Sequence, residues 1–154
     1  MILGIDPGFS GAASLLSPKG TLVDVYDLPL TINNNRKQID AHAFHTLIRH
    51  LAPSIKLVAI EDVHAMPEQG VSSTFRFGYN AGILFGVLAA HNLKVLKVSP
   101  AVWKNSLGLT RSKKLSLEMA AKLFPEQSQQ FKRMKDDGRA ESALIAYFVL
   151  KYFY

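Results

Sequence analysis

The sequence predicts an α/β fold in which helices flank a mixed five-stranded sheet. Two observations carry this prediction. Near the N-terminus, three short apolar runs follow one another with tight turns, which is typical of an antiparallel meander. Further along, apolar runs alternate with helical patterns, and a right-handed crossover brings such strands into parallel positions.

The predicted strands are apolar runs bounded by turn residues. The first run ends at Asp6, where Pro7 and Gly8 turn the chain. The other four runs are residues 11–16, 22–28, 56–61 and 94–98. The polar, asparagine-rich stretch 31–38 predicts a loop.

Helices are predicted where apolar residues recur every three or four positions. Residues 39–51 have such a face, and Pro53 ends it. A second helix runs to about His91, a short one carries Pro100 in its first turn, and another follows Ser112. The last helix, residues 138–152, is apolar nearly all round, so we expect it at the centre of the packing.

The helix that ends near His91 carries a row of small residues spaced by four. The row consists of Thr74, Gly78, Gly82, Gly86 and Ala90. Because glycine inside a helix costs about 1 kcal/mol relative to alanine, we expect something to approach this row closely. Two elements could do so. One is the sheet of the same chain, and the other is the same helix of a second copy in a symmetric dimer.

Composition narrows the class of protein. The 154 residues suffice for one domain, and the absence of cysteine excludes disulfides and thiolate metal sites. With no secretion signal and no apolar run near the roughly 20 residues that span a bilayer, we expect a cytoplasmic or nucleoid-associated protein without a membrane partner. The net charge of +6 favours an anionic partner.

Four carboxylates stand where the predicted fold would bring them together. Asp6 ends the first strand and Glu61 ends a parallel one, and α/β sheets bind ligands at this edge. Asp137 and Glu141 are four residues apart and share a face near the start of the last helix. A turn at Asp6 and helix capping by the other pair are the alternative explanations.

Acidic oxygens gathered at one place repel each other unless a hard cation neutralises them. We therefore expect Mg²⁺, two ions per site, with Mn²⁺ able to replace it. Two such ions can hold the attacking water and the leaving oxygen of a phosphodiester, as in many nucleases. The basic surface would then hold the polyanion whose phosphate enters the acidic site.

Several segments resemble the motifs of the RuvC family of Holliday-junction resolvases, in the branch that includes phage resolvases and plant chloroplast resolvases. These segments are Gly4-Ile5-Asp6-Pro7-Gly8, Ile60-Glu61, residues 64–75 and residues 137–146. The resemblance implies one RNase H-like domain over residues 1–154, a homodimer, and Mg²⁺-dependent nicking of two opposed strands of a four-way DNA junction. It also implies that four acids are catalytic and bind the metal, namely Asp6, Glu61, Asp137 and Glu141.

The chain departs from the bacterial motif at its C-terminal acids. The bacterial motif has two acids three residues apart, whereas Gly138 stands at that place here and the spacing is four. Asp136 would substitute for Asp137 if the helix started late. Glu141 is one methylene longer than the aspartate of many relatives.

The resemblance also implies DNA contacts. At the junction centre we expect Met66, Gln69, Gly70, Ser73, Phe75 and Arg76. Phosphate contacts along the arms are expected from Lys104, Arg111, Lys113, Lys114, Lys132, Arg133 and Lys135. The alternative to DNA contact is that Phe75 and Phe77 are core residues. His64 is a candidate outer-shell group for the metal.

Three other functions are compatible with parts of this pattern. The stretch from Asp6 to Ser10 also resembles the first loop of actin-like ATPases, but that fold needs two domains around its nucleotide, so we expect no nucleotide cofactor. A junction-binding protein without cleavage would not need all four acids. An RNase H-like nuclease acting on RNA or on other branched DNA would use the same acids.

Overall fold

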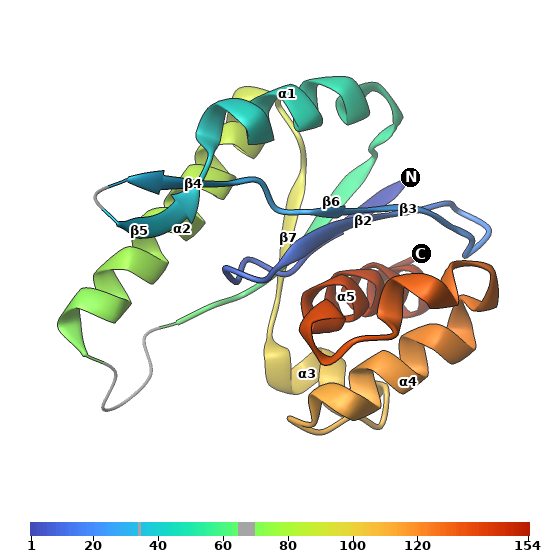
Figure 1. The fold of residues 1–154 in the computed structure, drawn as a ribbon. Coiled ribbons are helices and arrows are strands. Elements are labelled where there is room, and N and C mark those ends of the chain that lie inside the picture. The colour runs from blue at the N-terminus through green and yellow to red at the C-terminus, as the bar shows by residue number, and fades with distance from the viewer. Residues whose placement is uncertain (34, 65–69) are drawn as a thin grey trace.

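The chain has a five-stranded mixed sheet at its centre, as the sequence predicts (Figure 1). The computed structural model describes residues 1–33, 35–64 and 70–154. The strands of this sheet are β1 (Ile2–Ile5), β2 (Ala12–Leu16), β3 (Leu22–Asp27), β6 (Leu57–Glu61) and β7 (Val95–Val98). Their order across the sheet is β3-β2-β1-β6-β7.

Both predicted pairing modes are present. The first three strands form an antiparallel meander, and β6 lies parallel to β1 on one side and to β7 on the other. Ile5 is opposite Ile60 in the parallel pair. Asp6 and Glu61, the next residues of their strands, therefore reach the same edge of the sheet.

Helices cover both faces of the sheet. They are α1 (Ala41–Leu51), α2 (Val71–Ala90), α3 (Pro100–Ser106), α4 (Lys113–Leu123) and α5 (Asp137–Phe153). Short 3-10 turns are η1 (Ala52–Ser54), η2 (Pro125–Phe131) and η3 (Met134–Asp136). Figure 1 shows α1 and α2 on one side of the sheet and α4 and α5 on the other. No helix within the described ranges is long and apolar enough to cross a membrane.

Two hydrophobic cores result, one on each face. Ile2 belongs to the core under α4 and α5, whereas Leu3 and Ile5 belong to the core under α1 and α2. This division follows from the alternation of side chains along a strand. The prediction that the last helix is central is confirmed, because α5 packs against β1 and β2, and its middle is buried.

Two glycines allow α5 to lie directly on the backbone of the first strand and its loop. A Cβ atom at Gly4 would lie 2.1 Å from the carbonyl oxygen of Ser142. A Cβ at Gly138 would lie 2.1 Å from the carbonyl oxygen of Ser10. Gly138 thus departs from the bacterial motif at a point where no side chain fits, and the close approach brings the start of α5 beside Asp6.

The prediction of a loop over residues 31–38 is wrong. The chain forms an antiparallel hairpin of β4 (Leu30–Asn33) and β5 (Arg36–Ile39) there. Each strand has only four residues, and β5 is polar up to Ile39, so the apolar alternation that marks a strand in sequence is limited to Leu30 and Ile32. Ile39 ends β5, and α1 begins at Ala41 after Asp40 caps it.

The row of small residues on α2 faces open space. A Cβ atom built at Gly78, Gly82 or Gly86 would meet nothing within 4 Å. The buried side of α2 is instead formed by Asn80, Ala81, Leu84 and Leu88. The prediction that the row packs against the sheet is therefore wrong. Contact of the row with a second copy stays a prediction.

Candidate active site

The four carboxylates singled out in the sequence come from three elements that meet at one edge of the sheet. Asp6 follows β1, Glu61 ends β6, and Asp137 and Glu141 lie one turn apart at the start of α5. Their charges act on one another. Burial, followed by the charge of Glu61, raises the pKa of Asp6 to about 7, and Glu141 and Asp137 add to the rise. We call these four residues the acid cluster.

Neighbouring groups hold the two strand-borne acids in place. The backbone N–H of Gly8 donates a hydrogen bond of 3.1 Å to Oδ1 of Asp6. The indole Nε1 of Trp103, a fully buried side chain of α3, donates one of 3.0 Å to Oε1 of Glu61. Burial raises the pKa of Glu61, and the indole N–H offsets part of that rise.

Two lysines supply positive charge to the helix-borne acids. Nζ of Lys104 lies 2.8 Å from Oε1 of Glu141, which also accepts a hydrogen bond of 3.2 Å from Oγ of Ser116. Nζ of Lys113 lies 2.5 Å from Oδ2 of Asp137, and this contact raises the pKa of Lys113. Four acids thus share two ammonium groups, which leaves negative charge uncompensated.

The chemistry of the acid cluster suits a hard cation. Among the described residues, no three His, Asp or Glu side chains are arranged to hold a metal ion, and lysines pair with two of the four acids. The donors are carboxylate oxygens, which Mg²⁺ and Mn²⁺ prefer. The raised pKa of Asp6 also reflects a concentration of negative charge that a cation would relieve. The donor set therefore fits the metal, provided that the lysines move away.

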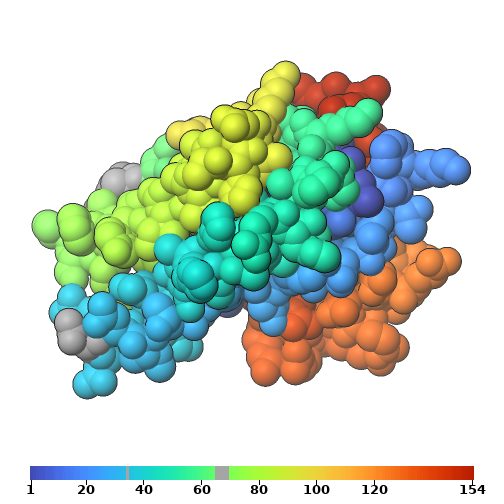
Figure 2. All heavy atoms as spheres, turned by 90° about the horizontal axis from the view of Figure 1, so that it is seen from above, coloured from blue at the N-terminus to red at the C-terminus, as the bar shows by residue number. Residues whose placement is uncertain are grey.

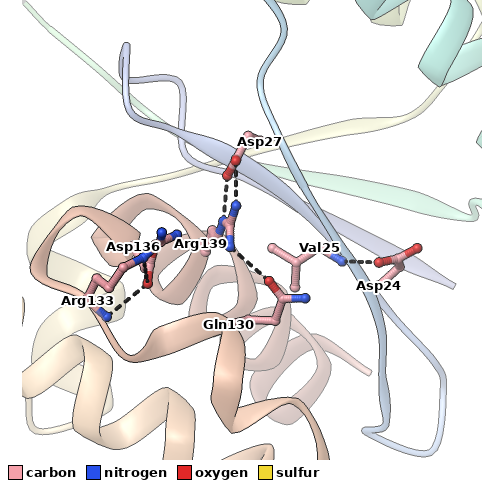
Figure 3. A network of polar contacts seen from close by, with 7 residues as sticks. All are labelled: Asp24, Val25, Asp27, Gln130, Arg133, Asp136 and Arg139. Atoms are coloured by element: carbon pink, nitrogen blue, oxygen red, sulfur yellow. Dashed lines mark hydrogen bonds and ion pairs between the residues drawn. The ribbon is translucent and has the colours of Figure 1, made fainter.

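Asp136 lies in a different set of contacts from the acid cluster. It accepts hydrogen bonds from the backbone N, Nε and Nη2 of Arg133, and these bonds hold its pKa below the usual value. Beside it, Arg139 binds Asp27 through Nε at 2.6 Å and Gln130 through Nη1 at 2.9 Å. Figure 3 shows these five side chains, which we call the arginine network. The structure thus places Asp137, and not Asp136, with Asp6.

Comparison with known proteins adds to this geometry. No protein-family model and no curated protein matches the chain. Solved structures are similar to it over nearly its whole length. RuvC of Thermus thermophilus in complex with a Holliday junction substrate has 15% sequence identity and a TM-score of 0.67, with 97% of this chain and 94% of that chain covered. This chain has the RuvC fold.

Two further structures agree on the architecture. Another Thermus thermophilus RuvC structure has 16% identity and a TM-score of 0.64, with 97% of this chain and 95% of that chain covered. The yeast mitochondrial Holliday junction resolvase Ydc2 has 17% identity and a TM-score of 0.51, with coverages of 97% and 78%. The RuvC fold therefore extends over nearly the whole chain.

The residues expected at a junction centre fall mostly on the N-terminal end of α2. Met66 and Gln69 lie outside the described residues. Gly70 caps α2, Ser73 is exposed, and Phe75 is 73% exposed, so a core role for Phe75 is wrong. Phe77 is half-buried. Arg76 stacks over the ring of Phe9, with 5.2 Å between the guanidinium carbon and the ring centroid.

The basic residues expected on DNA divide into four groups. Lys104 and Lys113 pair with Glu141 and Asp137 of the acid cluster, and Arg133 belongs to the arginine network. Lys114 lies 3.7 Å from Glu118 on the outer side of α4. The remaining three are exposed, namely Arg111, Lys132 and Lys135. His64 is exposed and lies 3.8 Å from Asp62, so its described contact is with that residue.

Sequence reasoning missed the roles of Trp103 and Ser116 in positioning the acids. A signal for Trp103 was available, because α3 directly follows β7, the parallel neighbour of β6, and starts at the edge that carries Glu61. No comparable signal marked Ser116. Its contact with Glu141 joins two helices of the RuvC fold and depends on how they pack.

Proposed function

We propose that this chain is a structure-specific endonuclease that nicks two opposed strands of a four-way DNA junction. One observation carries the proposal, which is the convergence of the acid cluster at the carboxyl edge of β1 and β6 in a chain with the RuvC fold. One of the similar proteins was solved with a Holliday junction substrate. The net charge of +6 suits a polyanionic substrate.

The acid cluster would bind Mg²⁺, two ions per site, with Mn²⁺ as a substitute. Its four carboxylates are the proposed catalytic residues and would hold the metal. When bound, the metal supplies Lewis-acid stabilisation of the phosphate and a water nucleophile of lowered pKa. The oxygen-only donor set and the raised pKa of Asp6 support this proposal.

The surrounding residues have separate roles in the proposed reaction. The N–H of Gly8 orients Asp6, and the indole of Trp103 orients Glu61, so both carboxylates keep one direction. Lys104 and Lys113 neutralise part of the acid cluster while it is empty of substrate. With the carboxylates holding a cation, the ammonium groups of Lys104 and Lys113 would be available to bind phosphate oxygens.

We further propose that the enzyme is a single-domain homodimer that works in the cytoplasm or on the nucleoid. Two symmetric copies would account for paired nicks on opposed strands. The open row Gly78, Gly82 and Gly86 offers a flat helix surface for the second copy.

The proposal is tested by incubating the protein with a labelled four-way junction, a linear duplex, a flap and an RNA hairpin, each with Mg²⁺ or a chelator. We expect paired nicks in the junction with Mg²⁺ and none with chelator. Equal cutting of the duplex would contradict junction specificity. No cutting of any substrate with Mg²⁺ or Mn²⁺ would contradict the assignment as a nuclease.

A further inference from the structure

Four of the five histidines lie on two neighbouring helices that cover one face of the sheet. His42, His45 and His50 belong to α1, and His91 directly follows α2. The two helices are in contact, and Figure 2 shows the atoms of α1 against those of the second half of α2. This arrangement brings together His45 and His91, which are 46 residues apart in the chain. We call these two residues the histidine pair.

The two rings of the histidine pair meet through nitrogen atoms. Nε2 of His91 lies 3.1 Å from Nδ1 of His45, and the ring centroids are 4.8 Å apart with an interplanar angle of 36°. A hydrogen bond between imidazoles needs one N–H and one lone pair, so at least one of the two rings is neutral. Both residues are half-buried, so the pair keeps some contact with solvent.

Packing on both helices fixes the backbone under the histidine pair. Phe44 and Ile48, on either side of His45 in the chain, are fully buried in the core under α1 and α2. Leu88, one turn before His91, is fully buried in the same core. Because both backbones are anchored in this way, the two nitrogens are held near each other without the help of a ligand.

The separation of the two nitrogens suits a transition-metal ion. A nitrogen ligand lies about 2.0–2.1 Å from Zn²⁺, so two such ligands at about 90–109° around one ion are about 2.8–3.4 Å apart. The 3.1 Å of the histidine pair is within this range. For both rings to bind one ion, the ring that donates the hydrogen bond moves its N–H to its other nitrogen, so that both facing nitrogens carry a lone pair.

The donor type separates the histidine pair from the acid cluster. Imidazole nitrogen suits Zn²⁺, Cu²⁺ and Ni²⁺, whereas carboxylate oxygen suits Mg²⁺ and Mn²⁺. Within the described part of the chain, no third His, Asp or Glu stands with the pair in a metal-binding arrangement. Water would complete the coordination, which makes the site open and its ion exchangeable.

We propose that the histidine pair is a binding site for one Zn²⁺ ion, which joins α1 to the end of α2. The pair shares no residue with the acid cluster, so this inference does not rest on the proposed nuclease function. An ion that binds only the folded state also stabilises it, and this site would tie together two helices of one core.

The test is titration of the protein with Zn²⁺ at pH 7.5 by isothermal titration calorimetry, with His45→Gln and His91→Gln as variants. Glutamine keeps a polar amide between the helices but supplies no imidazole. We expect each variant to bind Zn²⁺ at this site at least about 10-fold more weakly, since residues that only support a metal ligand already cost about 10–100-fold. The matched control is His42→Gln/His50→Gln, which removes two exposed histidines of α1 and should bind like the parent.

NMR of the imidazole nitrogens of the parent gives a second readout that needs no variant. Zn²⁺ should shift the resonances of the histidine pair and leave those of His42, His50 and His64 in place. Unshifted resonances of the pair, or equal Zn²⁺ binding by the parent and both folded variants, would overturn the proposal and leave a hydrogen bond between two helices.

A variant of the acid cluster separates this site from the proposed active site. Asp6→Asn/Glu61→Gln removes two carboxylates and should keep the Zn²⁺ site of the histidine pair, whether or not the parent nicks DNA. Loss of Zn²⁺ binding in this variant, with full binding in His45→Gln and His91→Gln, would place the ion in the acid cluster and contradict the proposal.

Discussion

Two groups of charged residues lie beside each other at the start of α5, and their charges are balanced in opposite ways. In the arginine network, two aspartates face two arginines, and the pKa of Asp27 and that of Asp136 are both lowered by the guanidinium groups. In the acid cluster, four carboxylates share two lysines, and the pKa of Asp6 and that of Glu61 are both raised, mainly by burial.

Under the proposed function, this difference separates a structural group, the arginine network, from the proposed catalytic one. The arginine network pairs each acid with a fork of N–H donors and so ties β3 to α5 (Figure 3). The acid cluster leaves carboxylates crowded and under-neutralised, which is costly for an isolated fold and favourable for a protein that binds cations. Neighbouring residues, such as Asp136 and Asp137, can therefore have unrelated roles.

The largest expected effect is on cleavage by Glu61→Gln. The amide keeps the shape of the side chain and can still accept the indole hydrogen bond, but it lacks the charge that a metal requires. We expect nicking of a four-way junction in Mg²⁺ to fall by at least about 100-fold. Residues that only support a metal ligand cost up to about 100-fold when they are mutated, and a ligand itself should cost at least as much. Junction binding in a gel-shift assay should persist. Glu118→Gln, an exposed acid on α4, is the matched control, and equal nicking by Glu61→Gln and this control would refute the role of Glu61.

Stability against pH should change in opposite directions in the two groups. The pKa of Asp6 is raised from 3.8 to about 7, so the folded state holds a proton that the unfolded state has lost, and stability falls as pH rises through that interval. Asp6→Asn should therefore stabilise the metal-free protein at pH 8 by about 1–3 kcal/mol and have little effect near pH 4.

Asp136→Asn should do the reverse. The pKa of Asp136 is lowered, so its stabilisation is present above the unfolded pKa of 3.8 and is lost as pH falls below it. The variant should be less stable by about 1–3 kcal/mol at pH 8, because a buried charge-assisted network is broken. Urea unfolding in chelator at pH 4 and pH 8 measures both variants. Destabilisation by Asp6→Asn at pH 8 would mean that the acid cluster is a structural group too.

The smallest expected effect is on salt dependence. Lys113 pairs with Asp137 of the acid cluster, and Lys114 pairs with Glu118 on the outer side of α4. If Lys113 alone meets phosphate, Lys113→Ala should lower the slope of log K against log[salt] for junction binding by about 0.9, and Lys114→Ala should lower it by less. Equal changes in both slopes would place both lysines on the DNA.

The convergence of Asp6 and Glu61 could be predicted because it follows from strand order alone. Each acid ends a strand, and the intervening helix makes the two strands parallel neighbours. The choice between Asp136 and Asp137 could not be predicted in this way. It depends on Arg133, whose side chain and backbone bind Asp136 and leave Asp137 as the first residue of α5.

The hairpin and the lysine pairs depend on contacts between distant residues. β5 is held by Asn80, 41 residues after Ile39, and this contact cannot be seen in the local, mostly polar sequence of the strand. Lys104 reaches Glu141 across 37 residues and two helices. A phosphate contact was therefore the natural prediction for Lys104, and the structure shows a lysine that already has an acidic partner.

The most direct test of the account is the ratio of nicking rates of Asp136→Asn and Asp137→Asn on one labelled four-way junction in Mg²⁺, at a temperature where both variants are folded. The account predicts that Asp137→Asn loses at least about 100-fold while Asp136→Asn stays within a few-fold of the parent. A loss by Asp136→Asn as large as that by Asp137→Asn would contradict the separation of the acid cluster from the arginine network.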